Sequence, residues 1–134
     1  MRAVLVDSNV LLDVLTEDAR WFDWSSRRLA EFAEERILLI NPIVYAEVSV
    51  GFSRIEDLEE ALSPAFFRRD PLPYEAGFLA GKAFLKYRRR GGKRERPLPD
   101  FFIGAHAAIS DLLLLTRDPV RYRTYFPTVE LAAP

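Results

Sequence analysis

The chain has 134 residues, of which 49% are hydrophobic and 13% aromatic, which is enough apolar material for one compact domain over residues 1–134. It contains no cysteine and a single histidine, so disulfide bonds, thiolate zinc sites and histidine-cluster metal sites are excluded, and any metal must be held by oxygen. No apolar run approaches the roughly 18 residues of a membrane span, so we expect a soluble, cytoplasmic protein without membrane contacts. The formal net charge of only -1 at pH 7 would by itself argue against a nucleic-acid partner, but the charges are unevenly distributed along the chain.

The first part of the chain alternates short apolar runs with helical periodicity. Ala3 to Val6 is continuously apolar and rich in valine and stops at a polar cluster, which is typical of a buried strand. Asn41-Pro42 is a helix start signal, with asparagine as the N-cap and proline at the first helical position. The predicted elements are, in order, a strand over 3–6, a helix from about 10, a helix over 21–36, a strand over 37–40 and a helix over 42–52.

The second part of the chain repeats this alternation after a region that prolines interrupt. Pro64, Pro71 and Pro73 break the chain after a polar helix over 54–62, and a helix is predicted over 74–89. An apolar helix over 101–110, a buried strand over 112–116 and a turn at 117–119 follow. Strands separated by helices imply crossover connections, so the sequence predicts an α/β fold with a mostly parallel central sheet flanked by helices.

Two aspartates come after predicted strands. Asp7 directly follows the first strand, and Asp118 lies two residues past the third. In open α/β sheets the ligand site lies beyond the carboxyl ends of the strands, so both carboxylates should face one crevice if these strands are neighbours. Taken alone, each acid is explained equally well as a helix cap or a turn residue.

Glu47 lies in a predicted helix that is apolar on nearly every side. Helical spacing puts it on the same face as Ile43 and Val50. A charged carboxylate on a buried face is costly unless it is paired or bound to a metal ion, which indicates a functional role. The alternative is that Glu47 points along a solvent-exposed strip with Ser49.

Asp100 begins the apolar helix over 101–110. Gly104 follows one turn later, where the missing side chain leaves room for something to approach closely. An aspartate that follows a proline is commonly a plain helix N-cap, and this simple alternative stays open for Asp100. His106 lies in the same helix, and we interpret it as a packed or partly exposed side chain rather than a metal ligand.

Four segments together resemble the PIN-domain family, and in particular the VapC toxins of bacterial and archaeal toxin-antitoxin pairs. They are DSNVLLD from Asp7, IVYAEV around Glu47, PDFFIGAHA from Pro99 and LLLLTRDPVRYRTYFP from Leu112. The resemblance covers nearly the whole chain and implies a PIN-like nuclease domain. It also implies an acidic catalytic and metal-binding quartet with supporting polar residues, which fall here on Asp7, Glu47, Asp100 and Asp118, and on Ser8, Asn9 and Thr116.

The implied chemistry is hydrolysis of an RNA phosphodiester with Mg²⁺ or Mn²⁺. These ions prefer oxygen ligands, and carboxylates brought to about 4 Å repel by on the order of 4 kcal/mol at an effective dielectric near 20, which a cation relieves. We expect Asp7 and Asp100 as the main direct ligands and Asp118 completing the shell directly or through water. Glu47 is expected to hold a water or to serve a second ion.

By resemblance, the chain is a metal-dependent endoribonuclease and the toxin of a VapBC-type pair, silenced by a cognate antitoxin and homodimeric. One alternative is a PIN domain that binds RNA or a partner without cutting. Another is a receiver-type signalling domain, which also has a magnesium-binding acidic pocket but needs a lysine late in the sheet. The last lysine here, Lys93, comes well before the final predicted strand, which disfavours that alternative.

A basic loop, residues 86–96, carries seven cations and one acid. Arginine and lysine give salt-sensitive affinity for phosphates, so the loop is a candidate RNA-binding element. A solvated loop, or one that meets an acidic partner, is an equal alternative. The residues that would contact RNA are Arg88, Arg89, Arg90, Lys93 and Arg94.

Overall fold

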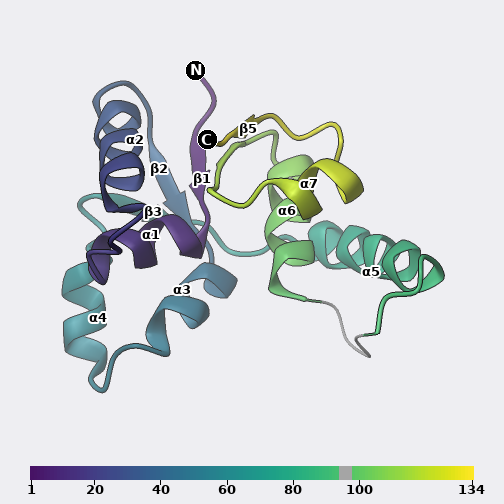
Figure 1. Ribbon diagram of the computed structural model, residues 1–134, viewed down its shortest axis with the longest axis horizontal. Coiled ribbons are helices and arrows are strands. Elements are labelled where there is room, and N and C mark those ends of the chain that lie inside the picture. Colours follow the sequence, from purple (N-terminus) through teal and green to yellow (C-terminus); the bar gives the residue numbers. More distant parts are fainter. Residues whose placement is uncertain (94–97) are drawn as a thin grey trace.

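The computed structural model of the protein describes residues 1–93 and 98–134. Its strands are β1 (Val4–Val6), β2 (Leu38–Ile40), β3 (Phe67–Arg69), β4 (Leu113–Leu115) and β5 (Leu131–Ala132). Its helices are α1 (Ser8–Leu15), α2 (Phe22–Glu35), α3 (Pro42–Ser49), α4 (Ile55–Ala61), α5 (Tyr74–Arg89), α6 (Pro99–Ile109) and α7 (Val120–Tyr125). Figure 1 shows α5, α6 and α7 grouped on one side of the sheet and α1 and α2 on the other.

The strands form one five-stranded sheet in the order β3-β2-β1-β4-β5, and every pair in it is parallel. The three central strands, β1, β2 and β4, are buried along their whole length, because helices cover both faces of the sheet. These are the three strands that the sequence predicted, and the α/β prediction is confirmed. The edge strands β3 and β5 were missed, because neither is buried along its whole length: β3 exposes Arg68 and Arg69, and β5 buries only Ala132.

The helix boundaries mostly follow the local signals. The side chain of Asn41 accepts a hydrogen bond from the Val44 N–H at 2.9 Å, which confirms the predicted N-cap of α3. This helix ends at Ser49, three residues before the predicted end. Helix α6 begins at Pro99, so Asp100 lies inside its first turn, and the expectation that Asp100 caps this helix is wrong. Helix α7 was not predicted.

The strand order separates the alternatives that the sequence left open. Receiver domains have the flavodoxin-like order 2-1-3-4-5, whereas the order here is 3-2-1-4-5, so the receiver alternative is wrong. The order reverses between β1 and β4, and the carboxyl ends of strands at such a switch point form the usual ligand crevice. None of the described helices has the length and apolar character that a membrane span requires.

Candidate active site

Asp7 lies at the switch point, directly after β1, with only 3% of its surface exposed. Its Oδ2 accepts hydrogen bonds from the Tyr122 hydroxyl at 2.8 Å and from the Thr116 hydroxyl at 2.9 Å. Although Asp7 occupies the N-cap position of α1, its side chain accepts no capping hydrogen bond. The simple interpretation of Asp7 as a helix cap is therefore wrong, and its carboxylate faces residues that follow β4 instead.

The predicted supporting residues link the ends of β1 and β4. Thr116, fully buried, accepts hydrogen bonds from the Asn9 amide at 3.2 Å and from the Asp118 backbone N–H at 3.1 Å. Asn9 also donates to Asp7 Oδ2 at 3.4 Å. Ser8 donates to Glu47 Oε1 at 2.8 Å, so it connects the start of α1 to α3. The structure thus places all three residues in one polar network with the acids.

Glu47 points into this network rather than along a solvent-exposed strip. It is half-buried, and the Ser8 hydrogen bond fixes its carboxylate beside the start of α1. The predicted helical face was wrong in one respect, because Val50 is 87% exposed. That position lies beyond the end of α3, where the chain turns outward.

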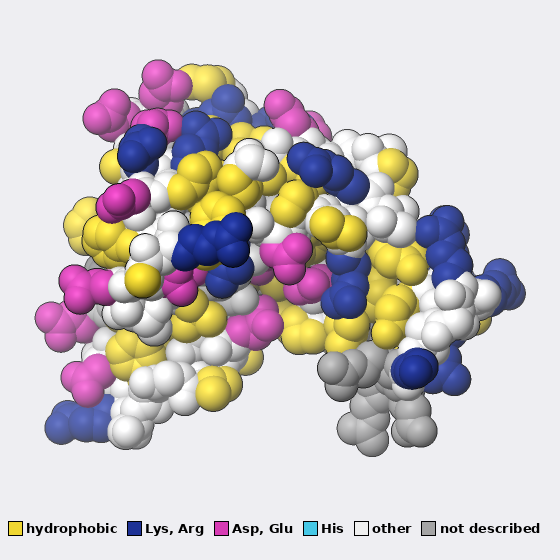
Figure 2. Space-filling view, in the orientation of Figure 1, with side chains coloured by type: hydrophobic (Ala, Val, Ile, Leu, Met, Phe, Trp, Pro, Cys, Tyr) yellow, Lys and Arg dark blue, Asp and Glu magenta, His cyan; other side chains and the backbone are white. Residues whose placement is uncertain are grey.

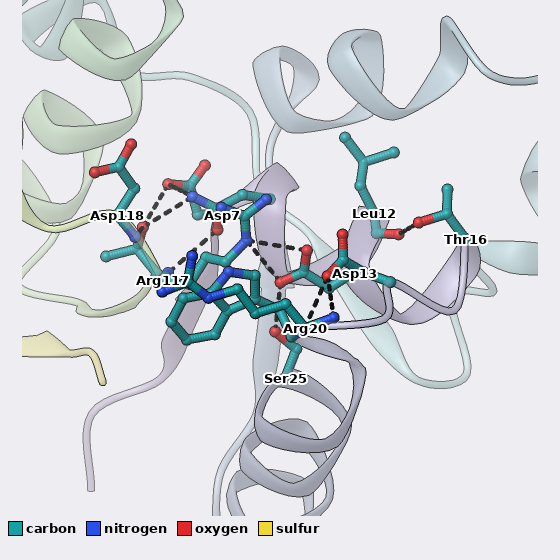
Figure 3. Close-up of polar contacts among 12 residues, drawn as sticks. Asp7, Leu12, Asp13, Thr16, Arg20, Ser25, Arg117 and Asp118 are labelled. Atoms are coloured by element: carbon teal, nitrogen blue, oxygen red, sulfur yellow. Dashed lines mark hydrogen bonds and ion pairs between the residues drawn. The ribbon is translucent and has the colours of Figure 1, made fainter.

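Asp100 reaches the site from the first turn of α6. Its Oδ1 lies 3.5 Å from the Tyr122 hydroxyl, and its Oδ2 lies 3.3 Å from the Arg121 guanidinium. Asp118, on the turn before α7, is exposed and contacts the network through its backbone N–H. Figure 3 shows Asp118 beside Asp7. The four acids therefore gather at one end of the sheet, three of them at least partly buried and Asp118 at the rim.

The acids perturb one another electrostatically. Burial, together with the negative charges of Asp100 and Glu47, raises the pKa of Asp7 from 3.8 to about 6, against hydrogen bonds from Tyr122 and Thr116 that lower it. Burial, together with the charge of Asp100, raises the pKa of Glu47. Burial also raises the pKa of Asp100, with Arg121 opposing the shift and Asp118 adding to it. The site thus concentrates negative charge that the protein alone only partly compensates.

The donor atoms suit a hard divalent cation, but the side chains are closed around one another. Among residues 1–93 and 98–134, no group of three or more His, Asp or Glu side chains is arranged so that it could hold a metal ion. The Tyr122 hydroxyl lies between Asp7 and Asp100, while Arg121 holds Asp100 and Ser8 holds Glu47. The carboxylates fit Mg²⁺ or Mn²⁺ by chemistry, and their side chains would have to rearrange to converge on one ion.

Two residues of the site were missed from the sequence. Tyr122 bridges two acids, and Arg121 pairs with one of them, yet both lie in the short helix α7 that was not predicted. The one signal in the sequence is the aromatic segment RYRTY. Its first tyrosine, Tyr122, is fully buried, and the hydroxyl of a buried tyrosine needs a hydrogen-bond partner. Nothing in its local spacing points to Asp7, 115 residues away.

A buried ion pair next to the site was also missed. Asp13, 2% exposed, accepts hydrogen bonds from Arg117 Nε at 2.8 Å and from the Ser25 hydroxyl at 2.7 Å. Figure 3 shows Asp13 flanked by these two side chains. Because Arg117 stands between Thr116 and Asp118, this ion pair fixes the turn after β4 against α1 and α2.

The remaining predicted residues lie outside the acid network. His106 is fully buried, and its Nδ1 lies 3.0 Å from the Asn41 amide, so it is a packed side chain as predicted. The space beside Gly104 is filled by the Phe126 ring. Arg88, Arg89, Arg90 and Lys93 are exposed at and after the end of α5, where Figure 2 shows Lys and Arg side chains gathered; the predicted Arg94 lies outside the described residues.

The raised pKa of Asp7 predicts a pH-dependent stability. A carboxyl whose pKa is higher in the folded than in the unfolded state favours folding while protonated, and this contribution is lost as the pH rises. The metal-free protein should therefore lose stability relative to Asp7→Asn as the pH rises from about 4 to about 7. A pKa change from 3.8 to about 6 corresponds to a loss of about 3 kcal/mol. Urea unfolding in EDTA measures this difference. A difference that does not vary with pH contradicts the assignment.

Comparisons with known proteins agree with this architecture. The sequence model of the PIN domain family matches residues 4–127. Solved structures with the same fold include VapBC2 from Rickettsia felis bound to a promoter DNA fragment (TM-score 0.76, 17% identity, 98% of each chain covered). FitAcB from Neisseria gonorrhoeae is also similar, with a TM-score of 0.72, 19% identity and coverage of 96% of this chain and 95% of that chain. So is a toxin-antitoxin complex from Klebsiella pneumoniae, with a TM-score of 0.64, 22% identity and 95% of each chain covered. No curated protein sequence matches the chain significantly.

Proposed function

The chain belongs to the PIN domain family, and on that premise we propose that it is an endoribonuclease that requires Mg²⁺ or Mn²⁺ and acts as the toxin of a toxin-antitoxin pair. One observation carries the proposal. Asp7, Glu47 and Asp100, from three separate elements, meet at the switch point of the sheet, where burial and neighbouring acids raise their pKa values. A purely structural role gives no reason for such an arrangement, because uncompensated buried carboxylates destabilise a fold.

The roles of the residues follow from their positions. A bound divalent ion supplies a water that is nucleophilic near neutral pH and stabilises charge on the attacked phosphate and the leaving oxygen. Asp7 and Asp100 would be its main ligands, and Asp118 at the rim would complete the shell directly or through water. Glu47, oriented by Ser8, is placed to orient a water, and Tyr122 keeps the Asp7 carboxylate directed toward Asp100.

Cleavage of RNA by the purified protein in Mn²⁺, and its loss in EDTA, tests the catalytic proposal. RNA that is bound but never cut would favour the alternative of a non-catalytic PIN domain. The raised pKa values favour cleavage over binding alone. A site that only binds RNA does not require concentrated negative charge, because RNA is itself a polyanion.

The toxin role is supported by the likeness to complexes of toxins with antitoxins. We propose that an antitoxin protein binds this chain and silences it, and that the chain forms a homodimer. Expression of the protein alone should arrest growth, and co-expression of the product of a neighbouring small gene should restore it. Growth unaffected by an active, well-expressed protein would argue against the toxin role.

We expect Mn²⁺ to stabilise the protein against heat. An ion that relieves the repulsion among the acids binds the folded state only, and at a hundredfold excess over Kd it adds about 2.7 kcal/mol, or roughly 5–10 °C in Tm. Thermal unfolding with and without millimolar Mn²⁺ measures the shift. Asp111→Asn, which changes an acid that is 83% exposed, should keep the shift, and Asp7→Asn should lose most of it. A Tm that Mn²⁺ leaves unchanged would count against the metal site.

A further inference from the structure

A pocket of about 310 Å³ opens beside the acids and has no role in the chemistry described above. Asp100 and Asp118 line it together with Tyr87, Tyr125 and Arg121. Apart from Asp118, on the turn before α7, these residues come from α5, α6 and α7, which pack against one another. The pocket is therefore lined both by acids of the proposed cleavage site and by aromatic rings and the Arg121 guanidinium.

The two tyrosine rings are held in fixed positions. Both are half-buried and pack edge-on against the fully buried Phe101, with ring centroids 5.6 Å away for Tyr87 and 5.5 Å away for Tyr125. The Gly92 backbone lies so close to Tyr87 that a Cβ there would come within 2.3 Å of the ring. Rings fixed in this way can bind a flat partner without first losing conformational freedom.

Two arginines add positive charge to these rings. The Arg121 guanidinium lies 5.8 Å from the Tyr87 centroid, and the Arg90 guanidinium lies 5.5 Å from the Tyr125 centroid. Arg121 also reaches Asp100 at 3.3 Å, so it stands between the aromatic surface and the acids. Because the guanidiniums lie over the rings, a base can stack on a guanidinium plane or take its place on the ring, while the arginine pairs with the phosphate of the same nucleotide.

We propose that this pocket binds one unpaired nucleotide of the RNA, adjacent to the phosphate that is cut. The inference rests on the proposed function and deepens it, because it assigns the nucleotide beside the cut phosphate to Tyr87, Tyr125 and Arg121. A base inside a duplex is already stacked and cannot reach the rings. The acids on the pocket wall disfavour a second phosphate there, so the base occupies the aromatic part and its own phosphate lies toward Arg121.

The test is the binding of a single-stranded oligoribonucleotide that contains one 2-aminopurine, whose fluorescence falls when the base stacks. Asp7→Asn serves as the background, so that the RNA stays intact. We expect binding to quench the fluorescence. Adding Tyr125→Leu should remove the quenching and weaken affinity about tenfold, whereas Tyr125→Phe should keep both, because it retains the ring. Phe66→Leu, which changes a 74% exposed aromatic just before β3, is the matched control and should have no effect.

A second measurement needs no substitution in the pocket. The same oligonucleotide with 4-thiouridine should crosslink on irradiation to Tyr87 or Tyr125, as mapped by mass spectrometry. Crosslinks found only elsewhere, unchanged quenching in Tyr125→Leu, or equal affinity for a duplex of the same sequence would each overturn the inference. If the native protein still cuts RNA, only the nucleotide pocket is wrong. If stacking is observed but Mn²⁺ gives no cleavage, the pocket stands and the catalytic proposal fails.

Discussion

Asp7→Asn is expected to reduce RNA cleavage by roughly a thousandfold or more, the equivalent of about 4 kcal/mol of transition-state stabilisation. The substitution keeps the shape of the side chain, and its remaining oxygen can still accept a hydrogen bond from Tyr122, but it removes the most deeply buried negative charge of the acid network. The Tyr122 hydroxyl of α7 and the Thr116 hydroxyl of the turn after β4 both donate to Asp7, so we expect no other acid to take its place.

Initial cleavage rates in Mn²⁺ at pH 7 measure this effect, with circular dichroism and urea unfolding as checks on folding. The unfolding experiments should show a variant at least as stable as the native protein without metal, because a carboxyl with a raised pKa destabilises the folded state at neutral pH. Asp111→Asn is the matched control and should cleave at the native rate. A well-folded Asp7→Asn that retains more than a tenth of native activity would refute the assignment.

Arg117→Ala is expected to lower the free energy of unfolding by about 3–5 kcal/mol, which is typical when one partner of a buried ion pair is removed. The variant leaves the Asp13 carboxylate, 2% exposed, with a hydrogen bond from Ser25 as its one remaining side-chain partner among the contacts described. The loss should also loosen the turn that carries Thr116 and Asp118, because the Arg117 side chain connects this turn to Asp13 of α1. Cleavage should therefore fall together with stability.

Two comparisons give the Arg117 experiment its controls. Arg28→Ala removes an ion pair at 2.7 Å with Glu31, whose side chain is 50% exposed, and a cation–π contact with Phe32, which together contribute about 1–2 kcal/mol. The double variant Asp13→Leu with Arg117→Met should regain most of the stability, because it buries no unpaired charge. A single Arg117→Ala that costs no more than Arg28→Ala would contradict the role of the ion pair.

The central strands and the helix starts were readable from the sequence because local chemistry determines them. A strand buried on both faces must be continuously apolar, so β1, β2 and β4 stood out, and Asn41 before Pro42 marked the start of α3. Asp7 and Asp118 could also be placed at one edge, since parallel strands end on the same side of the sheet. Asp7 and Asp118 lie close together if β1 and β4 are neighbouring strands, and in the structure these strands pair.

The rest of the site depends on contacts that local patterns do not encode. Ser8 and Glu47 meet across 39 positions, and Tyr122 and Asp7 across 115, through the packing of α3 and α7 on the sheet ends. The short strand β3 lies within the region that prolines interrupt and exposes two of its three residues, so no periodicity identifies it. Arg121 and the aromatic pocket could be recognised only once α5, α6 and α7 were seen packed together.

A crystal grown in Mn²⁺ and measured at the manganese absorption edge tests the central claim most directly. We expect an anomalous peak about 2.0–2.2 Å from carboxylate oxygens of both Asp7 and Asp100, with Asp100 turned away from Arg121. Glu47 or Asp118 should lie within reach of a water on the ion. Density for manganese only at other surface acids, or none at millimolar Mn²⁺ with Asp100 still paired to Arg121, would contradict the account.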